Sequence, residues 1–138
     1  MEKTFTVLKP DTVKAGSTGA IIGRLEKEGF RIRAMKMLHL TETQAQGFYY
    51  VHRERPFFGS LVKFMTEGPA VLMVLEAENA IEKLRKAMGA TDPAKAEEGT
   101  IRKRFGTNIE RNAIHGSDGP DTAAFEISYF FSQLEIVG

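Results

Sequence analysis

The sequence predicts an α+β fold, a four-stranded and largely antiparallel β-sheet with helices packed on one face. Two observations support this prediction. Strand-like and helix-like segments follow one another in the order βαββαβ, the strands marked by alternating or continuous apolar residues and the helices by helical spacing. Glycine and proline residues separate these segments, and no repeat or linker interrupts them. This order is that of the ferredoxin-like arrangement, expected here as one domain over residues 1–138.

The first strand and the first helix are marked by residues that end or begin regular structure. Residues 4–8 alternate between apolar and polar and stop before Pro10, which predicts the first strand. Ser17 or Thr18 can cap the N-terminus of a helix, and Gly29 terminates it. Between these ends the apolar residues recur at helical spacing.

The second strand is expected over residues 30–40, where the alternation slips near Ala34 and suggests a β-bulge. The segment that follows predicts two short helices, one on either side of Pro56. The first of them begins at Thr41 or Thr43, since either hydroxyl can act as an N-cap. Proline interrupts a helix, so one long helix is not expected here.

The remaining elements follow from a buried strand and two capped helices. Residues 71–75 are continuously apolar, which favours a central strand buried on both faces. Asn79 is expected to cap the next helix, which ends at Gly89. The long polar stretch after it predicts only a short helix. Residues 112–116 predict the last strand, and Asp121 is expected to cap the final helix.

Composition excludes several classes of function. The chain has 19 Lys and Arg against 18 Asp and Glu, whereas general nucleic-acid or membrane-surface binders are usually more one-sided. It has no Cys, which excludes disulfides, thiolate metal sites and cysteine nucleophiles. Of its three histidines, His39 and His52 lack a companion at metal-ligand spacing. No signal-peptide pattern and no membrane-length apolar run is present, so a cytoplasmic location is expected.

The third histidine, His115, lies at the predicted end of the last strand, directly before Gly-Ser-Asp. A neutral imidazole is a competent nucleophile near pH 7, and a carboxylate on the following helix, Glu126, could hold its second ring nitrogen. A turn histidine bonded to Ser117 or Asp118 is the other interpretation. Taken alone, this segment favours the turn interpretation.

Isolated basic residues point to phosphate. Lys9, Arg55 and Arg85 lie near strand ends or in loops, where they could converge on a polyphosphate. Surface ion pairs are the alternative for each of them. Phe57 follows a proline and could stack on a base, or pack in the core. The glycine-rich phosphate loops G-x-x-x-x-G-K-[ST] and G-x-G-x-x-G are absent.

Five segments share one pattern along the chain. They are Thr4-Phe5-x-x-Leu8-Lys9-Pro10-Asp11, Arg55-Pro56-Phe57-Phe58, Gly89-Ala90-Thr91-Asp92-Pro93, Gly99-Thr100-Ile101-Arg102 and Asn112-Ala113-Ile114-His115-Gly116-Ser117-Asp118. In this order they resemble the nucleoside diphosphate kinase family, in particular its short, bacterial-type members. The resemblance covers essentially the whole chain. Two positions depart from it: Thr12 stands where the family often has Gly, and Gly119 where Ser is common.

The resemblance implies an activity and a catalytic centre. The enzyme would move the γ-phosphoryl group of a nucleoside triphosphate to a nucleoside diphosphate by a ping-pong mechanism, through a phosphohistidine on His115. Lys9 and Tyr49 match further catalytic positions, and Ser117 and Glu126 match the pair that orients the histidine. Broad base specificity follows, because stacking holds a base without distinguishing its edge.

The resemblance also implies how the nucleotide is bound. Phosphate, sugar hydroxyls and base would be held by nine residues: Lys9, Phe57, Leu61, Arg85, Thr91, Arg102, Ile109, Asn112 and Tyr49. Arg55 matches a position at the border of the site. Mg²⁺ would arrive on the nucleotide's phosphates, with Asp118 reaching it through water and no protein residue binding it directly. The chain would form a homo-oligomer, a tetramer or a hexamer.

Two rival functions use the same features. The βαββαβ order also occurs in RNA-recognition domains, but no stretch of this chain matches their aromatic strand motif. The run Arg102-Lys103-Arg104 is more typical of a solvated face than of an RNA-binding patch. An inactive relative with an assembly or regulatory role is the other alternative. It is disfavoured because each matched site position holds the family's residue type.

Overall fold

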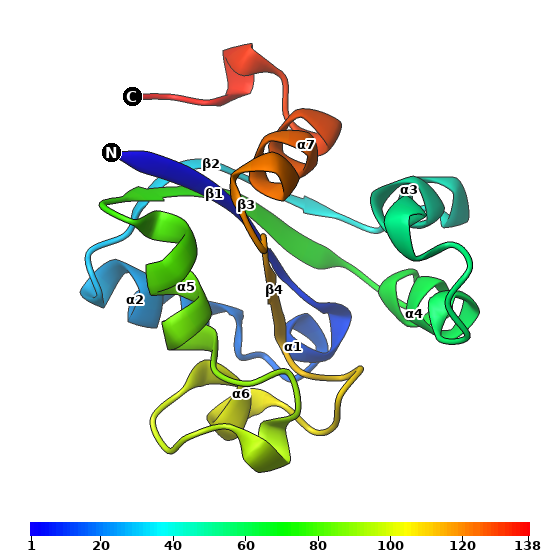
Figure 1. Ribbon diagram of the computed structural model, residues 1–138. Coiled ribbons are helices and arrows are strands. Elements are labelled where there is room, and N and C mark those ends of the chain that lie inside the picture. Colours follow the sequence, from blue (N-terminus) through cyan, green and yellow to red (C-terminus); the bar gives the residue numbers. More distant parts are fainter.

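The sheet has four strands, and every neighbouring pair is antiparallel (Figure 1). The computed structural model describes the whole chain, residues 1–138. Across the sheet the strands are β2 (Arg31–Leu38), β3 (Ala70–Ala77), β1 (Glu2–Leu8) and β4 (Ile114–Gly116). The two inner strands are therefore β3 and β1, and the short β4 lies at one edge.

Seven helices surround this sheet. They are α1 (Pro10–Lys14), α2 (Thr18–Lys27), α3 (Glu42–Phe48), α4 (Phe58–Met65), α5 (Ala80–Met88), α6 (Ile101–Phe105) and α7 (Pro120–Phe130), with 3₁₀ turns at Tyr50–His52, Pro93–Lys95 and Gln133–Glu135. The five-residue helix α1 was not predicted, because Pro10 was interpreted only as the end of a strand. Proline is in fact well suited to a first helical position, where no N–H is needed. None of the helices has the length and apolar character that a membrane span requires.

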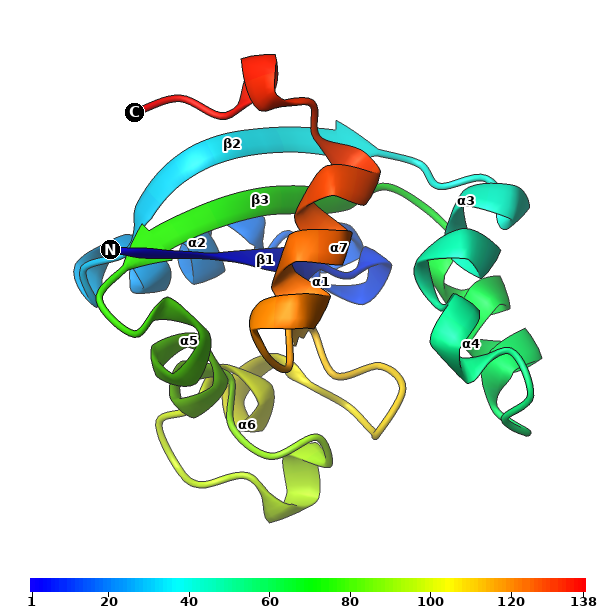
Figure 2. The same cartoon turned by 45° about the horizontal axis from the view of Figure 1, so that its top comes forward.

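The helices cover both faces of the sheet, so the prediction of helices on one face is wrong. Figure 2 shows α7 on one side of the strands and α2 on the other. Each side has its own apolar core, one containing side chains of α2, α5 and α6, the other side chains of α3, α4 and Phe131 after α7. The reason lies in β3, whose eight residues are all buried. Met73 faces the first core and Leu72 the second, and both faces need cover.

The predicted bulge and the central strand are confirmed, whereas three of the predicted caps, Ser17, Asn79 and Asp121, make no capping hydrogen bond with their side chains. The pairing of β2 with β3 shifts its register between Ile32 and Ala34. Asn79 adopts a left-handed conformation (φ 50°) and caps nothing with its side chain. The carboxylate of Glu2 instead accepts a hydrogen bond from the Ile81 N–H (2.9 Å). Such a partner from a distant strand is invisible to a local sequence pattern.

Of the two predicted starts of the helix before Pro56, Thr41 and Thr43, the first is correct. Thr41 is its N-cap, and its hydroxyl accepts a hydrogen bond from the Gln44 N–H (3.1 Å), while the Gln44 side chain returns one to the Thr41 N–H. The last helix starts at Pro120, not at a capping Asp121. There the Thr122 hydroxyl accepts hydrogen bonds from the backbone at the helix start.

We expect the central strand to dominate the stability of the fold. The substitution Leu72→Ala should lower the free energy of unfolding by about 2–5 kcal/mol, because Leu72 is fully buried in β3 and a cavity would remain. Urea denaturation measures this loss. The same substitution at Leu134, which is 95% exposed, should change it by less than about 0.5 kcal/mol. Equal effects at the two positions would contradict the assignment of the core.

Candidate active site

The edge strand β4 holds His115 beside β1, where it pairs with Val7. The imidazole Nε2 lies 2.9 Å from Oε1 of Glu126, which comes from α7. The Ser117 hydroxyl donates a second hydrogen bond to the same oxygen (2.6 Å). Three residues from one strand, its following turn and the next helix thus form a chain of hydrogen bonds that ends at the histidine ring.

Aromatic side chains fix the plane of the ring. Phe48 of α3 meets the imidazole edge-on at a centroid distance of 5.3 Å, and Phe5 of β1 does so at 6.4 Å. The Thr6 hydroxyl also donates to the His115 carbonyl (2.7 Å). Since Nε2 is bound by a carboxylate, Nδ1 is the ring nitrogen that has no partner within the chain.

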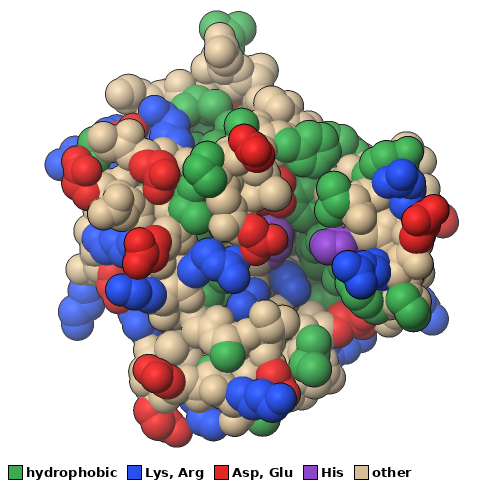
Figure 3. All heavy atoms as spheres, in the orientation of Figure 1, with side chains coloured by type: hydrophobic (Ala, Val, Ile, Leu, Met, Phe, Trp, Pro, Cys, Tyr) green, Lys and Arg blue, Asp and Glu red, His purple; other side chains and the backbone are tan.

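A cavity of about 520 Å³ opens at this histidine. Figure 3 shows histidine and basic side chains gathered at the hollow between α7, α4 and the loops below the sheet. Residues of the helices α3 to α7, of the strand β4 and of connecting segments line the cavity. A volume of this size suits a small organic ligand.

Two cations are buried in the wall of the cavity without a carboxylate partner. Lys9, only 6% exposed, donates through Nζ to Oδ1 of Asn112 (2.8 Å). Arg102, only 8% exposed, donates to the carbonyls of Gly89 (3.2 Å) and Ile114 (2.8 Å). Neutral acceptors orient both cations, and no carboxylate forms an ion pair with either of them, which favours an anion in the cavity.

The electrostatics of the two cations reflect this arrangement. Burial, followed by the charge of Arg102, lowers the pKa of Lys9 to about 8. Burial, followed by the charge of Arg85, lowers the pKa of Arg102 to about 10. Arg85 itself is half-exposed and pairs with Asp118 at the mouth of the cavity (2.7 Å). Three positive groups therefore lie close enough to raise the cost of one another's charge.

Two buried polar atoms near these cations also have no hydrogen-bond partner, the Tyr49 hydroxyl and Nε of Arg102. Burial, followed by the charges of Glu126 and Glu110, raises the pKa of Tyr49 above its ordinary value, so its hydroxyl stays protonated. Buried donors without partners are rare in native proteins. An oxygen-rich anion would supply the acceptor that the Tyr49 hydroxyl, a lining group of the cavity, lacks.

The other end of the cavity is apolar and more open. Phe57, directly before α4, is 47% exposed, and Leu61 and Ile109 line the same end. The ring of His52 lies 5.5 Å from that of Phe57. One wall thus comes from α4 and the preceding turn, the other from the loop before β4. A flat aromatic group fits such a slot.

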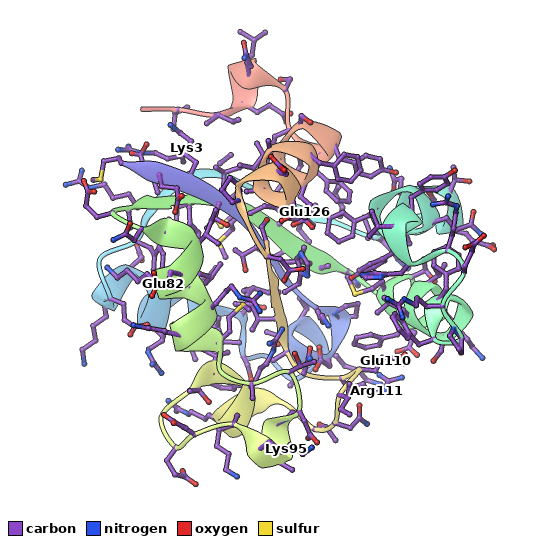
Figure 4. All side chains as sticks on the ribbon, viewed as in Figure 1. Lys3, Glu82, Lys95, Glu110, Arg111 and Glu126 are labelled. Atoms are coloured by element: carbon purple, nitrogen blue, oxygen red, sulfur yellow. The ribbon has the colours of Figure 1, made fainter.

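Polar contacts join these two walls. The Ser60 hydroxyl donates to both carboxylate oxygens of Glu110 (3.1 and 2.8 Å). Arg111 makes two hydrogen bonds to Glu67 (3.1 and 2.7 Å), and its guanidinium lies over the ring of Phe64. Figure 4 shows Glu110 and Arg111 at the tip of the loop that faces α4, with Glu126 nearer the sheet.

Comparisons with known proteins agree with this geometry. The family model described as nucleoside diphosphate kinase matches residues 2–136. The chain belongs to the nucleoside diphosphate kinase family. The nucleoside diphosphate kinase of Desulfosudis oleivorans is 61% identical over 100% of this chain and 99% of its own length. That of Geotalea uraniireducens is 58% identical over 99% and 100% of the two chains.

Solved structures of the family confirm the predicted α+β, ferredoxin-like fold class. The Aquifex aeolicus nucleoside diphosphate kinase superimposes with a TM-score of 0.97 at 49% identity, and the alignment covers 99% of both chains. The Halobacterium salinarum nucleoside diphosphate kinase, solved in complex with CDP, gives a TM-score of 0.96 at 41% identity and covers 99% of this chain and 91% of its own.

The cavity brings together most of the residues predicted from the resemblance to nucleoside diphosphate kinases. Those that line it are Lys9, Tyr49, Phe57, Leu61, Arg85, Thr91, Arg102, Ile109, Asn112, His115, Asp118 and Glu126. Ser117 lies behind this surface, fully buried and bonded to Glu126. Arg55 is exposed and does not line the cavity. The turn interpretation of His115 is wrong, since its ring contacts Glu126 and neither Ser117 nor Asp118.

Three polar residues of the lining were missed from the sequence, His52, Glu110 and Thr122. His52 was tested only as a metal ligand. Its position three residues after Tyr49 in a helical segment would have placed both on one side of that segment. Glu110 directly follows Ile109, but loop residues have no period from which the direction of a side chain follows. Only the folded loop brings Glu110 to the cavity.

We expect neutral His115 to be the tautomer with its proton on Nε2, because the Glu126 carboxylate accepts a hydrogen bond only from an N–H. Ring-labelled ¹⁵N NMR distinguishes the two tautomers. The Glu126→Ala variant removes the acceptor and should give a mixture of them. A wild-type spectrum dominated by the tautomer with its proton on Nδ1 would contradict the arrangement.

Proposed function

We propose that His115 carries a phosphoryl group from one nucleotide to another within this single cavity. The chain is a nucleoside diphosphate kinase, by its full-length similarity to the relatives above. What supports the role of His115 is that it lines a cavity with buried cations, and that its Nδ1 has no partner while Nε2 is bound to Glu126. One reusable site explains how a chain of 138 residues serves a donor and an acceptor.

The proposed reaction has two mirrored steps. In the first, the Nδ1 lone pair of His115 attacks the γ-phosphorus, and the bond to the β,γ-bridging oxygen breaks, with its electron pair leaving on the diphosphate. In the second, a β-phosphate oxygen of the acceptor attacks that phosphorus, and the phosphorus–nitrogen bond returns its pair to Nδ1. The Glu126 carboxylate stabilises the positive charge that the ring carries between the two steps.

The cations of the cavity neutralise the charge that spreads over the transferred group. Lys9, Arg102 and Arg85 provide positive charge, and the hydroxyls of Tyr49 and Thr91 provide neutral donors. Phosphoryl transfer needs mainly such positioning and electrostatic stabilisation. The Tyr49 hydroxyl and Nε of Arg102, which are buried without a partner, gain acceptors when phosphate oxygens are present.

The apolar end of the cavity is proposed to bind the base and the sugar. Phe57 stacks on the base, with Leu61 and Ile109 against it, and stacking accepts every base. Lys9 and Asn112, already bonded to each other, hold the sugar hydroxyls. The Halobacterium salinarum relative was solved with CDP, which supports nucleotide binding in this family.

The donor set of the cavity fits a magnesium ion that arrives with the nucleotide. No group of three or more His, Cys, Asp or Glu residues is placed to hold a metal ion. Asp118 offers an exposed carboxylate at the mouth of the cavity, beside Arg85, and oxygen is the ligand that Mg²⁺ prefers. When bound, Mg²⁺ neutralises phosphate charge; Asp118 would hold it through water.

We further propose one domain over residues 1–138 in a cytoplasmic homo-oligomer, a tetramer or a hexamer, on the family resemblance.

The phosphohistidine can be tested directly. Incubation with γ-labelled ATP should label His115 with a phosphoryl group that is stable in alkali and labile in acid. The variant His115→Ala should lose transfer while it keeps its fold and binds ADP, since only the nucleophile is removed. An undiminished label in this variant would contradict the role of His115.

The lowered pKa of Lys9 predicts a pH dependence. Lys9 is charged below about pH 8 and neutral above it. We therefore expect kcat/KM to fall as the pH rises through about 8, because the free enzyme loses a phosphate- and sugar-binding charge. The Lys9→Gln variant, which keeps an N–H donor for Asn112, should be less active and should lack this decline. A decline of the same midpoint in Lys9→Gln would assign it to another group.

A further inference from the structure

The backbone just before His115 adopts an unfavourable conformation. Ala113 has φ +76°, in the left-handed region, although it is neither glycine nor asparagine. It is completely buried, between Asn112 and β4. A methyl side chain cannot support this conformation by hydrogen bonding. A local hydrogen bond from the Ile114 N–H to the Asn112 carbonyl (2.9 Å) closes a γ-turn at this residue, a rare and strained conformation. Such strain persists only where contacts from the surroundings support it.

The contacts come from Lys9, directly after β1, and from the first turn of α1. The Ala113 N–H donates to Oδ2 of Asp11 (3.0 Å). Its carbonyl accepts from the Lys9 N–H (2.9 Å) and from the Thr12 hydroxyl (2.9 Å). The carbonyl therefore has two donors, whereas the N–H depends on one acceptor. Asp11 is the contact that no other group duplicates.

The carboxylate of Asp11 makes no other direct polar contact, although its charge raises the pKa of Lys9 against the larger lowering by burial. Its bond to Ala113 is the one hydrogen bond that the side chain makes, and its other oxygen, Oδ1, is buried without a partner. It forms no ion pair with any basic residue within 4.0 Å. Asp11 also lies in the first turn of α1, but a helix of five residues gains little from an acid there.

Residue 113 separates the two ends of the proposed site. Asn112 on one side bonds to Lys9, where the sugar would lie. On the other side the Ile114 carbonyl holds Arg102, and His115 follows. A change in the Ala113 backbone would rotate Asn112 and His115 relative to each other. We infer that Asp11 is a positioning residue, which holds Ala113 at its positive φ and thereby positions the bound nucleotide relative to the His115 nucleophile.

This inference rests on the proposed function, and its test uses a rescue. The variant Asp11→Ala should bind ADP more weakly and lose roughly tenfold or more in kcat/KM, since small misplacements in a site are costly. Glycine adopts positive φ readily. The double variant Asp11→Ala/Ala113→Gly should therefore recover most of the activity, and Ala113→Gly alone should stay close to wild type. Calorimetric ADP affinity and steady-state rates are measured for each variant.

Two further variants separate positioning from folding and from charge. Thr12→Val removes a bond to the Ala113 carbonyl, which the Lys9 N–H still holds, so activity should stay near that of the wild type even where stability falls. Asp11→Asn keeps an oxygen that can accept the N–H and should retain most activity. Urea denaturation of every variant shows which are folded at the assay temperature.

The outcomes are distinct. Wild-type kinetics and ADP affinity in folded Asp11→Ala, or failure of Ala113→Gly to rescue it, would overturn the inference. So would an equal loss in folded Asp11→Asn, which would point to charge instead of the hydrogen bond. If Asp11→Ala does not fold, the folded double variant Asp11→Ala/Ala113→Gly decides, since weak ADP binding and low activity in it would overturn the inference. Absence of phosphoenzyme in the wild type would contradict the proposed function, while ADP affinity would still decide the role of Asp11.

Discussion

Burial of Lys9 and Arg102 without a carboxylate partner is the constraint on which the rest of the molecule depends. Desolvation of a cation is costly, and here neutral oxygens only orient the two charges. Two apolar cores, one on each face of the sheet, provide the stability that tolerates this cost. The arrangement leaves a cavity complementary to an anion before any ligand arrives. Such preorganisation is what electrostatic stabilisation of a phosphoryl group requires.

The same region combines strain with rigidity. His115 lies on a three-residue edge strand, which by itself would hold a side chain loosely. Glu126 accepts hydrogen bonds from Ser117 and from the ring Nε2, and these bonds, together with the edge-on contacts of Phe5 and Phe48, remove that freedom. The geometry of the nucleophile is thus determined by α7, α3 and β1 more than by its own strand.

The sequence predicted those features that depend on local pattern or on a specific motif. The apolar run of β3 predicted a strand buried on both faces, and the segment Asn112 to Asp118 identified the histidine. Features that depend on distant partners escaped: Glu2 replaces Asn79 as a cap, and Glu110 reaches the cavity only through the fold of its loop. A strand buried on both faces, such as β3, implies helices on both faces of the sheet, but the sequence pattern was interpreted as helices on one face. Arg55, expected at the border of the site, is exposed and does not line the cavity.

The two ends of the cavity differ in what holds them together. Buried hydrogen bonds fix the walls around Lys9 and Arg102. At the base end, α4 and the opposite loop are joined by the exposed pairs Ser60–Glu110 and Glu67–Arg111. Dissolved ions screen exposed charges far more than buried ones. Rising ionic strength should therefore weaken the binding of the base, so that KM responds to salt. The chemistry at His115 stays unchanged, so kcat does not respond.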